Sequence, residues 1–260
     1  MAAQGTVEKL VRRAGWLVSS TSDMIDHLRR RAEFRALRRG AAVQRVREPL
    51  GHRTRHTYKV AAGHALTTFA LNQRWRIVRR LYPERLTTLL DIGCCRGWFV
   101  VQAAMRSECE RALGIDVVQG FIDAANDAKR LLKLENAQFE YAFLDDLVAD
   151  PQKYRTPYQT IVLLNTYHYM FWGSAYSPKH WPDHEYMLRS LSELCTDRVI
   201  FMSPLEVSEC PSDIGKRARE HPDWAAQFTT ERFLEVASRY FDVSHQTYLA
   251  LRPLYLMKKK

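Results

Sequence analysis

Residues 89–99, which read "LLDIGCCRGWF", decide the fold predicted for this chain. The stretch has the pattern of a buried strand, an aspartate at its tip, a turn between two glycines and the start of a helix. Gly93 and Gly97 permit tight turn geometry and close approach of the main chain to a ligand. The helix that begins near Gly97 presents free N–H groups that attract a carboxylate. We therefore predict a ligand site beside Asp91, where this strand ends.

From residue 87 onward, apolar strand patterns alternate with helical patterns. This alternation is typical of an α/β fold with a doubly wound, mostly parallel sheet that is covered on both faces. Seven strands are expected, at residues 87–93, 111–118, 137–144, 158–165, 197–205, 241–249 and 252–260. Helices are expected at residues 97–108, 120–134, 184–195 and 229–240, the last with a Thr cap. The link between the last two strands is too short for a crossover, so the C-terminal strand is expected to be antiparallel.

The charge is distributed unevenly along the chain. Residues 1–86 hold 19 Lys and Arg against 6 Asp and Glu, a net charge of +13. The whole chain carries +10, so residues 87–260 carry −3. We predict a basic helical extension over residues 1–85 ahead of a domain over residues 86–260, with helical patterns at 6–18, 22–39 and 63–81. The basic faces are either solvated or a docking surface for nucleic acid, a membrane surface or a phosphorylated substrate.

Several classes of protein are not indicated by the sequence. No apolar run approaches the roughly 18 residues needed to cross a bilayer, and no secretory signal is recognisable at the N-terminus. The five cysteines form no CxxC pair, which favours free thiols in a reducing cytosol. We expect a cytoplasmic protein, with peripheral membrane association as an option. His180 and His184 are four residues apart but flank Pro182, and no acidic motif accompanies them, so no metal site is predicted.

The ends of the next strands also carry acids. Asp116 ends the second strand, and Asp145 and Asp146 follow the third. In a doubly wound sheet the ligand lies at the carboxyl ends of the strands, near the switch point of the topology. A carboxylate in the position of Asp116 can accept hydrogen bonds from both hydroxyls of a ribose.

The segments "LLDIGCCRGWF", "ALGIDVV", "AFLDDL" and "IVLLNTYHYMF", in this order, resemble the class I S-adenosylmethionine-dependent methyltransferases. The resemblance covers roughly residues 86–256, including the terminal strand hairpin. It implies S-adenosyl-L-methionine as cofactor. It also implies contacts to the methionine part from Gly93 and Gly97, to its ammonium from Asp91, to the ribose from Asp116 and to the adenine amino group from Asp145. Cys95, Asp146 and Asn165 complete the cofactor-binding residues implied by the resemblance.

One position departs from the family's pattern, because Cys95 stands where these enzymes usually have Gly. A thiol side chain is small and need not block the cofactor, but the departure leaves open a catalytically dead relative that only binds. Arg96 is either a surface residue or a contact to the cofactor carboxylate. A nicotinamide dehydrogenase is disfavoured, since its G-x-G-x-x-G spacing is absent from "GCCRG".

An aromatic-rich segment at residues 165–183 follows the fourth strand and is predicted to be the substrate loop. Its alternative role is a lid that packs on its own Trp172, Tyr176 and Trp181. His168 is the candidate catalytic base if the acceptor is a hydroxyl, and otherwise a packing residue. If the segment is extended, alternation points Tyr167 and Tyr169 away from the side on which His168 lies.

These features together predict in-line methyl transfer to an acceptor, with O-methylation of a glycan, lipid-linked or small-molecule substrate preferred. The alternatives are a tRNA-modifying methyl or carboxymethyl transferase, because "TYHY" resembles the "LYH" region of such enzymes, and a dead methyltransferase fold that acts as a binding protein. The basic N-terminal third is expected to bind the acceptor, an anionic membrane surface or RNA. The sequence indicates no oligomeric state.

Overall fold

The computed structural model describes residues 24, 28, 32, 44–45, 58–61, 64–177, 179–249 and 252–260. The helices predicted over residues 6–18 and 22–39 therefore lie outside the described residues, apart from three helical positions in the second of them. No helix in the described part of the chain combines the length and the apolar character needed to cross a membrane.

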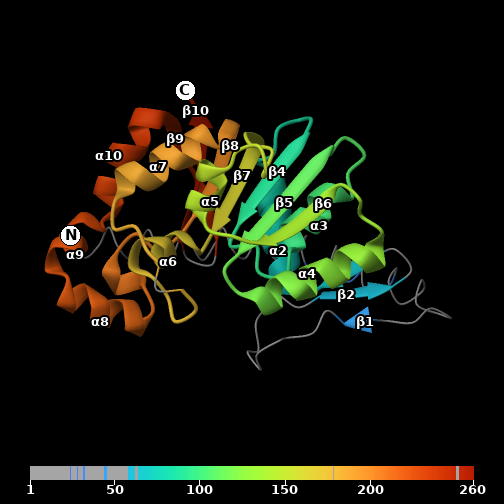
Figure 1. Ribbon diagram of the computed structural model, residues 1–260, viewed down its shortest axis with the longest axis horizontal. Coiled ribbons are helices and arrows are strands. Elements are labelled where there is room, and N and C mark those ends of the chain that lie inside the picture. The colour runs from blue at the N-terminus through green and yellow to red at the C-terminus, as the bar shows by residue number, and fades with distance from the viewer. Residues whose placement is uncertain are drawn as a thin grey trace.

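A seven-stranded sheet forms the centre of the molecule (Figure 1). Its order is β6 (Ala137–Tyr141), β5 (Arg111–Asp116), β4 (Thr88–Ile92), β7 (Tyr158–Leu164), β8 (Cys195–Met202), β10 (Arg252–Lys259) and β9 (Phe241–Leu249). The strands from β6 to β8 pair in parallel, whereas β10 is antiparallel to both β8 and β9. This arrangement confirms the predicted doubly wound sheet and its antiparallel C-terminal strand.

The alternation of side chains along the strands gives the sheet two apolar faces. In β4, Leu90 and Ile92 join one cluster of buried residues, and Leu89 joins the other. The first cluster includes α5 (Leu144–Ala149), α6 (Tyr167–Trp172), α7 (His184–Glu193) and α10 (Thr230–Tyr240). The second includes α2 (Phe69–Arg79), α3 (Trp98–Ala104) and α4 (Gln119–Leu132). Both faces of the sheet are therefore removed from water, which is the main source of stability.

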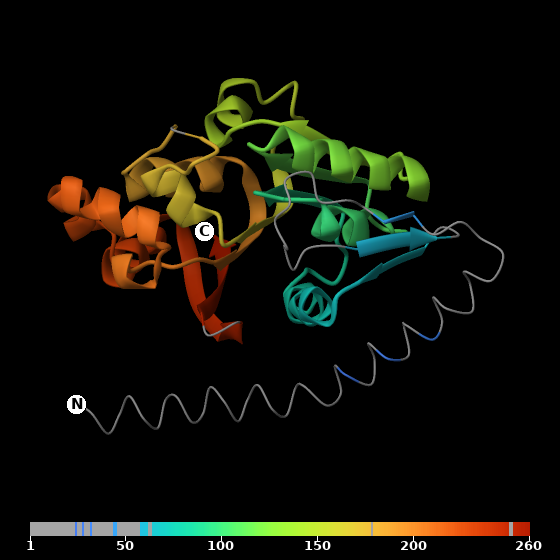
Figure 2. The same cartoon turned by 90° about the horizontal axis from the view of Figure 1, so that it is seen from below.

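The segment ahead of the sheet differs from its prediction. A single helix was expected over residues 63–81, but a hairpin of β2 (Tyr58–Ala61) and β3 (His64–Thr67) precedes α2, and β1 (Gln44–Arg45) pairs with β2. The helix starts later because the Thr68 side chain accepts the N–H of Leu71 and caps it. Figure 2 shows the hairpin alongside α4.

This N-terminal hairpin is tied to the glycine turn. The Tyr58 hydroxyl donates a hydrogen bond of 2.7 Å to the carbonyl oxygen of Arg96, and the Tyr58 ring lies 5.1 Å from that of Trp98. Side chains of α2 continue the same cluster of buried residues, at Leu71, Trp75 and Val78. Residues from Tyr58 to the end of α2 thus share a hydrophobic core with the sheet. The domain boundary at residue 85 stays a prediction.

Three short elements between β8 and α10 were not predicted. They are a 3-10 helix η1 (Val207–Glu209), α8 (Ser212–Glu220) and α9 (Pro222–Gln227). Figure 1 shows α8 and α9 near α6. Ile214 and Ala218, one helical turn apart, bury the inner face of α8. This polar stretch packs on the core through only a few apolar residues, so its helical pattern is weak in the sequence.

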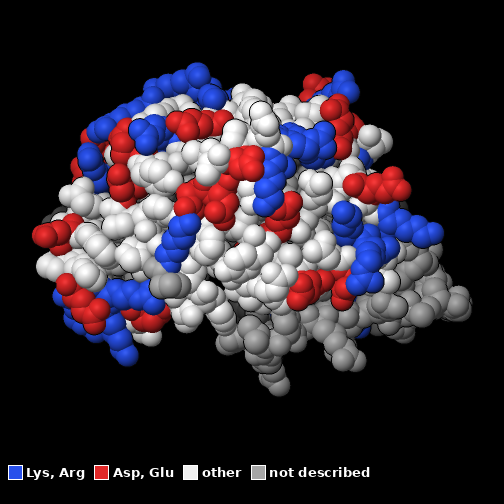
Figure 3. All heavy atoms as spheres, viewed as in Figure 1, with Lys and Arg blue, Asp and Glu red and all other residues white. Residues whose placement is uncertain are grey.

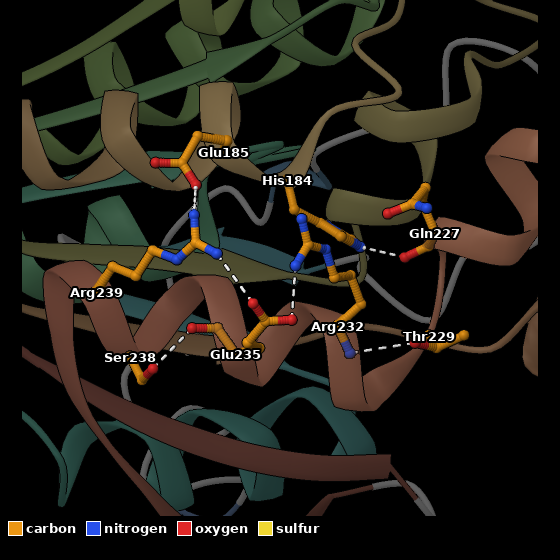
Figure 4. Close-up of polar contacts among 8 residues, drawn as sticks. All are labelled: His184, Glu185, Gln227, Thr229, Arg232, Glu235, Ser238 and Arg239. Atoms are coloured by element: carbon orange, nitrogen blue, oxygen red, sulfur yellow. Dashed lines mark hydrogen bonds and ion pairs between the residues drawn. The ribbon is translucent and has the colours of Figure 1, made fainter.

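The outer helices α7 and α10 are joined by charged side chains (Figure 4). Arg239 bridges Glu185 at 2.7 Å and Glu235 at 2.9 Å, and Arg232 reaches Glu235 at 2.6 Å. These groups are substantially exposed, so each pair contributes at most about 1 kcal/mol. Thr229 caps α10 by accepting the Arg232 N–H, which confirms the predicted cap.

Candidate functional site

A cavity of about 360 Å³ opens at the carboxyl ends of β4, β5 and β7. These strands flank the switch point of the sheet, because the chain leaves β4 toward β5 on one side and later returns to β7 on the other. The volume lies in the ~300–1,000 Å³ range of small-molecule sites. The cavity walls come from the glycine turn, the end of β5, the start of α5, the segment around α6, and α8.

The two glycines of the turn serve different purposes. Gly93 has φ 75°, and a Cβ there would lie 2.1 Å from Thr166 Oγ1, so only Gly fits. It lines the cavity. Gly97 has φ 74°, but a Cβ there would meet the Phe139 ring at 2.2 Å. Gly97 does not line the cavity and is required by packing, which differs from the methionine contact implied by the resemblance.

Cys95 occupies the backbone conformation that Gly favours. Its φ is 51°, in the left-handed region, which costs an L-residue about 1–2 kcal/mol. Its N–H donates a hydrogen bond of 2.8 Å to Asp116 Oδ2. The Cys at this position therefore keeps the main-chain geometry of the turn and its contact with the end of β5.

Asp116 lies at the wall of the cavity with its carboxylate held by the main chain. It accepts the N–H of Cys95 and, at 3.0 Å, that of Val118. Burial raises the pKa of Asp116 to about 6, against the opposing effect of these hydrogen bonds. The predicted ribose residue is thus fixed in orientation at the cavity.

Asp91 is the most unusual charged group of the site. It is buried, and its Oδ2 has no hydrogen-bond partner among the described residues. Burial, and to a smaller extent the neighbouring Asp116, raise the pKa of Asp91 to about 8. A small adjoining hollow of about 30 Å³ is lined by Asp91 together with Gly93 and Cys95. A buried carboxylate oxygen without a partner beside a hollow suits a cationic group of a ligand.

The two acids after β6 have other partners than the adenine predicted for Asp145. Asp145 forms an ion pair with Lys179 and does not line the cavity. The Lys179 ammonium also lies 4.6 Å from the centre of the Phe143 ring. Asp146 accepts the N–H of Phe143 at 2.8 Å and so holds the start of α5. The residues of this segment that do line the cavity are Ala142, Phe143 and Leu144, which were not predicted.

The segment after β7 is helical where an extended chain was expected. Asn165 has φ 58°, lines the cavity, and its side-chain oxygen accepts a hydrogen bond from Arg252. From there α6 begins, and a helix places residues three and four apart on one face. Thr166, Tyr169 and Met170 consequently line the cavity together. The expectation that alternation directs Tyr167 and Tyr169 to the same side is wrong for this reason.

The helix turns His168 away from the cavity. The ring Nδ1 of His168 lies 3.0 Å from Ser203 Oγ, and the main-chain N–H of His168 donates to the same oxygen at 3.3 Å. The side chain is buried, and it does not line the cavity. Burial, with the charge of Arg252 as a second cause, lowers the pKa of His168 to about 3. These contacts match the packing role that the sequence left open, and they do not match the predicted base.

His180 and His184, the pair with a spacing of four residues, have separate surroundings. Tyr167 donates a hydrogen bond of 2.6 Å to His184 Nδ1. His184 Nε2 donates to the Gln227 carbonyl at 3.1 Å, as Figure 4 shows. The ring is therefore the neutral Nε2–H tautomer, and burial lowers its pKa to about 4. The His180 ring lies 5.2 Å from that of Trp224. Within the described ranges, no three His, Cys, Asp or Glu side chains are grouped as metal ligands.

The end of the cavity beyond Asn165 is lined by residues of the predicted substrate loop and by one residue of α8. They are Tyr169, Ser174, Tyr176 and, from α8, Asp213. Asp213 comes from α8, which was not predicted, so its proximity to the glycine turn had no signal in the sequence. This end of the cavity combines aromatic rings, hydroxyls and one carboxylate.

The described surface on the face drawn in Figure 3 has no large patch of one charge sign. Figure 3 shows Lys and Arg interleaved with Asp and Glu there. Of the 19 Lys and Arg in residues 1–86, 12 fall outside the described residues, so the docking surface stays a prediction.

No protein-family model and no curated protein matches the chain. Among solved structures, WbdD in complex with the kinase inhibitor LY294002 has a TM-score of 0.54 at 17% identity, covering 72% of this chain and 40% of WbdD. A structure of "the bifunctional kinase-methyltransferase WbdD" has a TM-score of 0.51 at 18% identity, covering 72% and 39%.

The N-methyltransferase NodS from Bradyrhizobium japonicum WM9 has a TM-score of 0.49 at 14% identity, covering 73% of this chain and 96% of NodS. At this TM-score it carries no argument. The chain spans about 40% of the length of WbdD, and the likeness concerns the fold alone. The chain has the fold of the class I methyltransferases, as the sequence predicted.

Proposed function

We propose that this chain transfers a methyl group from S-adenosyl-L-methionine to a hydroxyl of a glycan, lipid-linked or small-molecule acceptor. The observation that carries the proposal is the carboxylate of Asp91, buried with an unpartnered oxygen beside Gly93 at the switch point of a class I fold. A buried carboxylate of this kind is stable only with a cationic partner or a proton, and the cofactor offers an ammonium.

The residues at the cavity fit the other parts of the cofactor. Asp116 is held by two main-chain N–H groups and has further lone pairs for ribose hydroxyls. Phe121, Phe143 and Leu144 supply apolar walls on which a purine can pack. When bound, the cofactor supplies an electrophilic methyl on a sulfonium. The chain's contribution is to hold and orient both reactants and to exclude water.

The acceptor class is favoured by the opposite end of the cavity. Its polar groups are mainly neutral hydroxyls, from Thr166, Tyr169, Ser174 and Tyr176. Hydroxyls donate and accept hydrogen bonds, so they suit a hydroxylated acceptor and offer no charge to bind a strongly anionic one. This supports a sugar-like or other hydroxyl-bearing small molecule over a polyphosphate backbone at this cavity.

Calorimetry with S-adenosylmethionine and S-adenosylhomocysteine tests cofactor binding. Asp116→Asn should weaken binding ten- to a hundredfold, about 1.5–3 kcal/mol, because an amide accepts fewer hydrogen bonds from the ribose. Asp123→Asn, on the exposed side of α4, is the matched control and should bind as the wild type does.

Transfer itself is tested with methyl-labelled cofactor and separate RNA, lipid and polar-metabolite fractions. Label in the lipid or polar fraction agrees with the proposal. Label in RNA would favour a tRNA-modifying enzyme. Cofactor binding with no labelled fraction would favour a binding protein on a dead methyltransferase fold.

A further inference from the structure

We propose that Asp213 takes the proton of the acceptor hydroxyl as the methyl group is transferred. The inference rests on the methyl-transfer function proposed above and assigns the base of that reaction. It replaces His168, whose imidazole is directed at Ser203 and away from the cavity. A hydroxyl is a poor nucleophile until its proton is removed, so a positioned base contributes about 10²–10⁴ in rate.

Asp213 is distinguished from the other acids of the cavity by its contacts. Two carboxylates line the described part of the cavity wall, Asp116 and Asp213. Asp116 is committed to the N–H groups of Cys95 and Val118 at the cofactor end. Asp213 forms no hydrogen bond or ion pair through its carboxylate with any residue that the structure describes. It is therefore available to a ligand in that cavity.

The helix that carries Asp213 is docked firmly enough to position it. Ile214 is fully buried, and Arg217 donates a hydrogen bond of 2.8 Å to the carbonyl oxygen of Trp172, the last residue of α6. Residues 213 and 217 are one turn apart, so they share the side of α8 that is turned toward α6. The same α6 carries Tyr169 into the cavity.

Electrostatics agree with this placement. Burial first, and Asp213 second, raise the pKa of the Tyr169 hydroxyl, so the carboxylate lies within electrostatic reach of that ring. Tyr169 accordingly keeps its proton and cannot serve as the base. Lys179, which also lines the cavity, is in an ion pair with Asp145 that raises its pKa. Neither of them competes with Asp213 for the proton.

The position of Asp213 also selects the reacting group. A carboxylate repels an anionic nucleophile such as a phosphate or another carboxylate, whereas it accepts a hydrogen bond from a neutral hydroxyl. In the step, the hydroxyl oxygen forms a bond to the methyl carbon. The carbon–sulfur bond breaks, and its electron pair stays on sulfur. The hydroxyl proton passes to Asp213, which is exposed and releases it to water.

The test uses the full chain, methyl-labelled S-adenosylmethionine, and whichever of the RNA, lipid or polar-metabolite fractions the wild type labels. Asp213→Asn keeps the size of the side chain and removes its charge, and Asp213→Glu restores a carboxylate. Glu220→Gln, at the exposed far end of the same helix, is the matched control. Thermal melting and calorimetry with S-adenosylhomocysteine show that each variant is folded and binds cofactor.

We expect Asp213→Asn to transfer methyl ~10²–10⁴-fold more slowly than wild type, with a cofactor affinity within about twofold of wild type. Asp213→Glu should recover part of the rate. Glu220→Gln should match wild type in both rate and affinity. The labelled product should be an ether that survives dilute alkali. Release of labelled methanol would identify a methyl ester, and retention on a cation exchanger an amine, and either result overturns the assignment. So does an Asp213→Asn enzyme within threefold of wild type. Failure of the wild type to bind cofactor would instead refute the proposed function and, with it, the assignment.

Discussion

Replacing Asp91 with asparagine tests the electrostatics of the site while keeping its shape. The pKa of Asp91 is about 8 in the folded chain, against 3.8 for an unperturbed aspartate. Above about pH 4 the unfolded chain loses this proton, whereas the folded chain keeps it until about pH 8. The contribution of Asp91 to stability is therefore fully present below about pH 4 and is lost as the pH rises toward 8.

The magnitude follows from the same pKa values. One pKa unit corresponds to about 1.4 kcal/mol, so the contribution falls by about 2–3 kcal/mol between pH 5 and pH 7. Asn cannot ionise and has no such loss. The free energy of unfolding of Asp91→Asn, relative to that of the wild type, should therefore rise by about 2–3 kcal/mol from pH 5 to pH 7. This change is expected whichever of the two proteins is more stable at pH 5. Urea unfolding followed by circular dichroism at pH 5, 6 and 7 measures the difference.

The same substitution should have the opposite effect on ligand binding. Asn lacks the charge that would pair with the cofactor ammonium, so Asp91→Asn should bind S-adenosylhomocysteine at least tenfold more weakly although it is the more stable protein near neutral pH. Asp123→Asn, exposed on α4, controls for the general loss of a charge. A constant stability gap between Asp91→Asn and wild type from pH 5 to pH 7 would refute the view that Asp91 is buried and protonated.

Three further substitutions test the surrounding structure. Cys95→Gly should raise the free energy of unfolding by about 1 kcal/mol, measured in urea, because it relieves a left-handed backbone at φ 51°. Tyr167→Phe should lower it by about 1–2 kcal/mol, seen in the same assay, because His184 Nδ1 loses its buried donor. His168→Asn should keep cofactor affinity and turnover within about threefold of wild type, since His168 faces Ser203; a hundredfold loss of turnover would restore it as the base.

The sheet could be predicted because its signals are local. Each strand from β4 to β8 is a short apolar run followed by a turn or a helical pattern, and buried parallel strands need no partner pattern to be recognised. Two residues separate β9 from β10, a link that is only long enough for a hairpin. The acids at the ends of β4 and β5 then followed, because the topology brings those ends together.

Within the predicted substrate loop at residues 165–183, the directions of individual side chains could not be predicted, because the local signals there are ambiguous. The segment "YHYMFW" of α6 is apolar and aromatic throughout, and a run of six such residues fits the period of a strand as well as that of a helix. That ambiguity reversed the directions assigned to His168 and Tyr169. The resemblance implied an adenine contact for Asp145, but its partner Lys179 comes from a distant loop. Long-range pairs of this kind have no pattern in a single sequence.

The departure at Cys95 bears on whether the chain is a dead relative. The geometry of the turn requires a left-handed backbone at residue 95 and a main-chain N–H directed at Asp116. Cys95 meets both, with φ 51° and a hydrogen bond of 2.8 Å. Relative to Gly, Cys95 costs about 1–2 kcal/mol of stability, and its side chain does not line the 360 Å³ cavity. The substitution that removes the family's Gly is therefore a cost to folding and leaves the groups offered to a cofactor, Asp91, Gly93 and Asp116, in place.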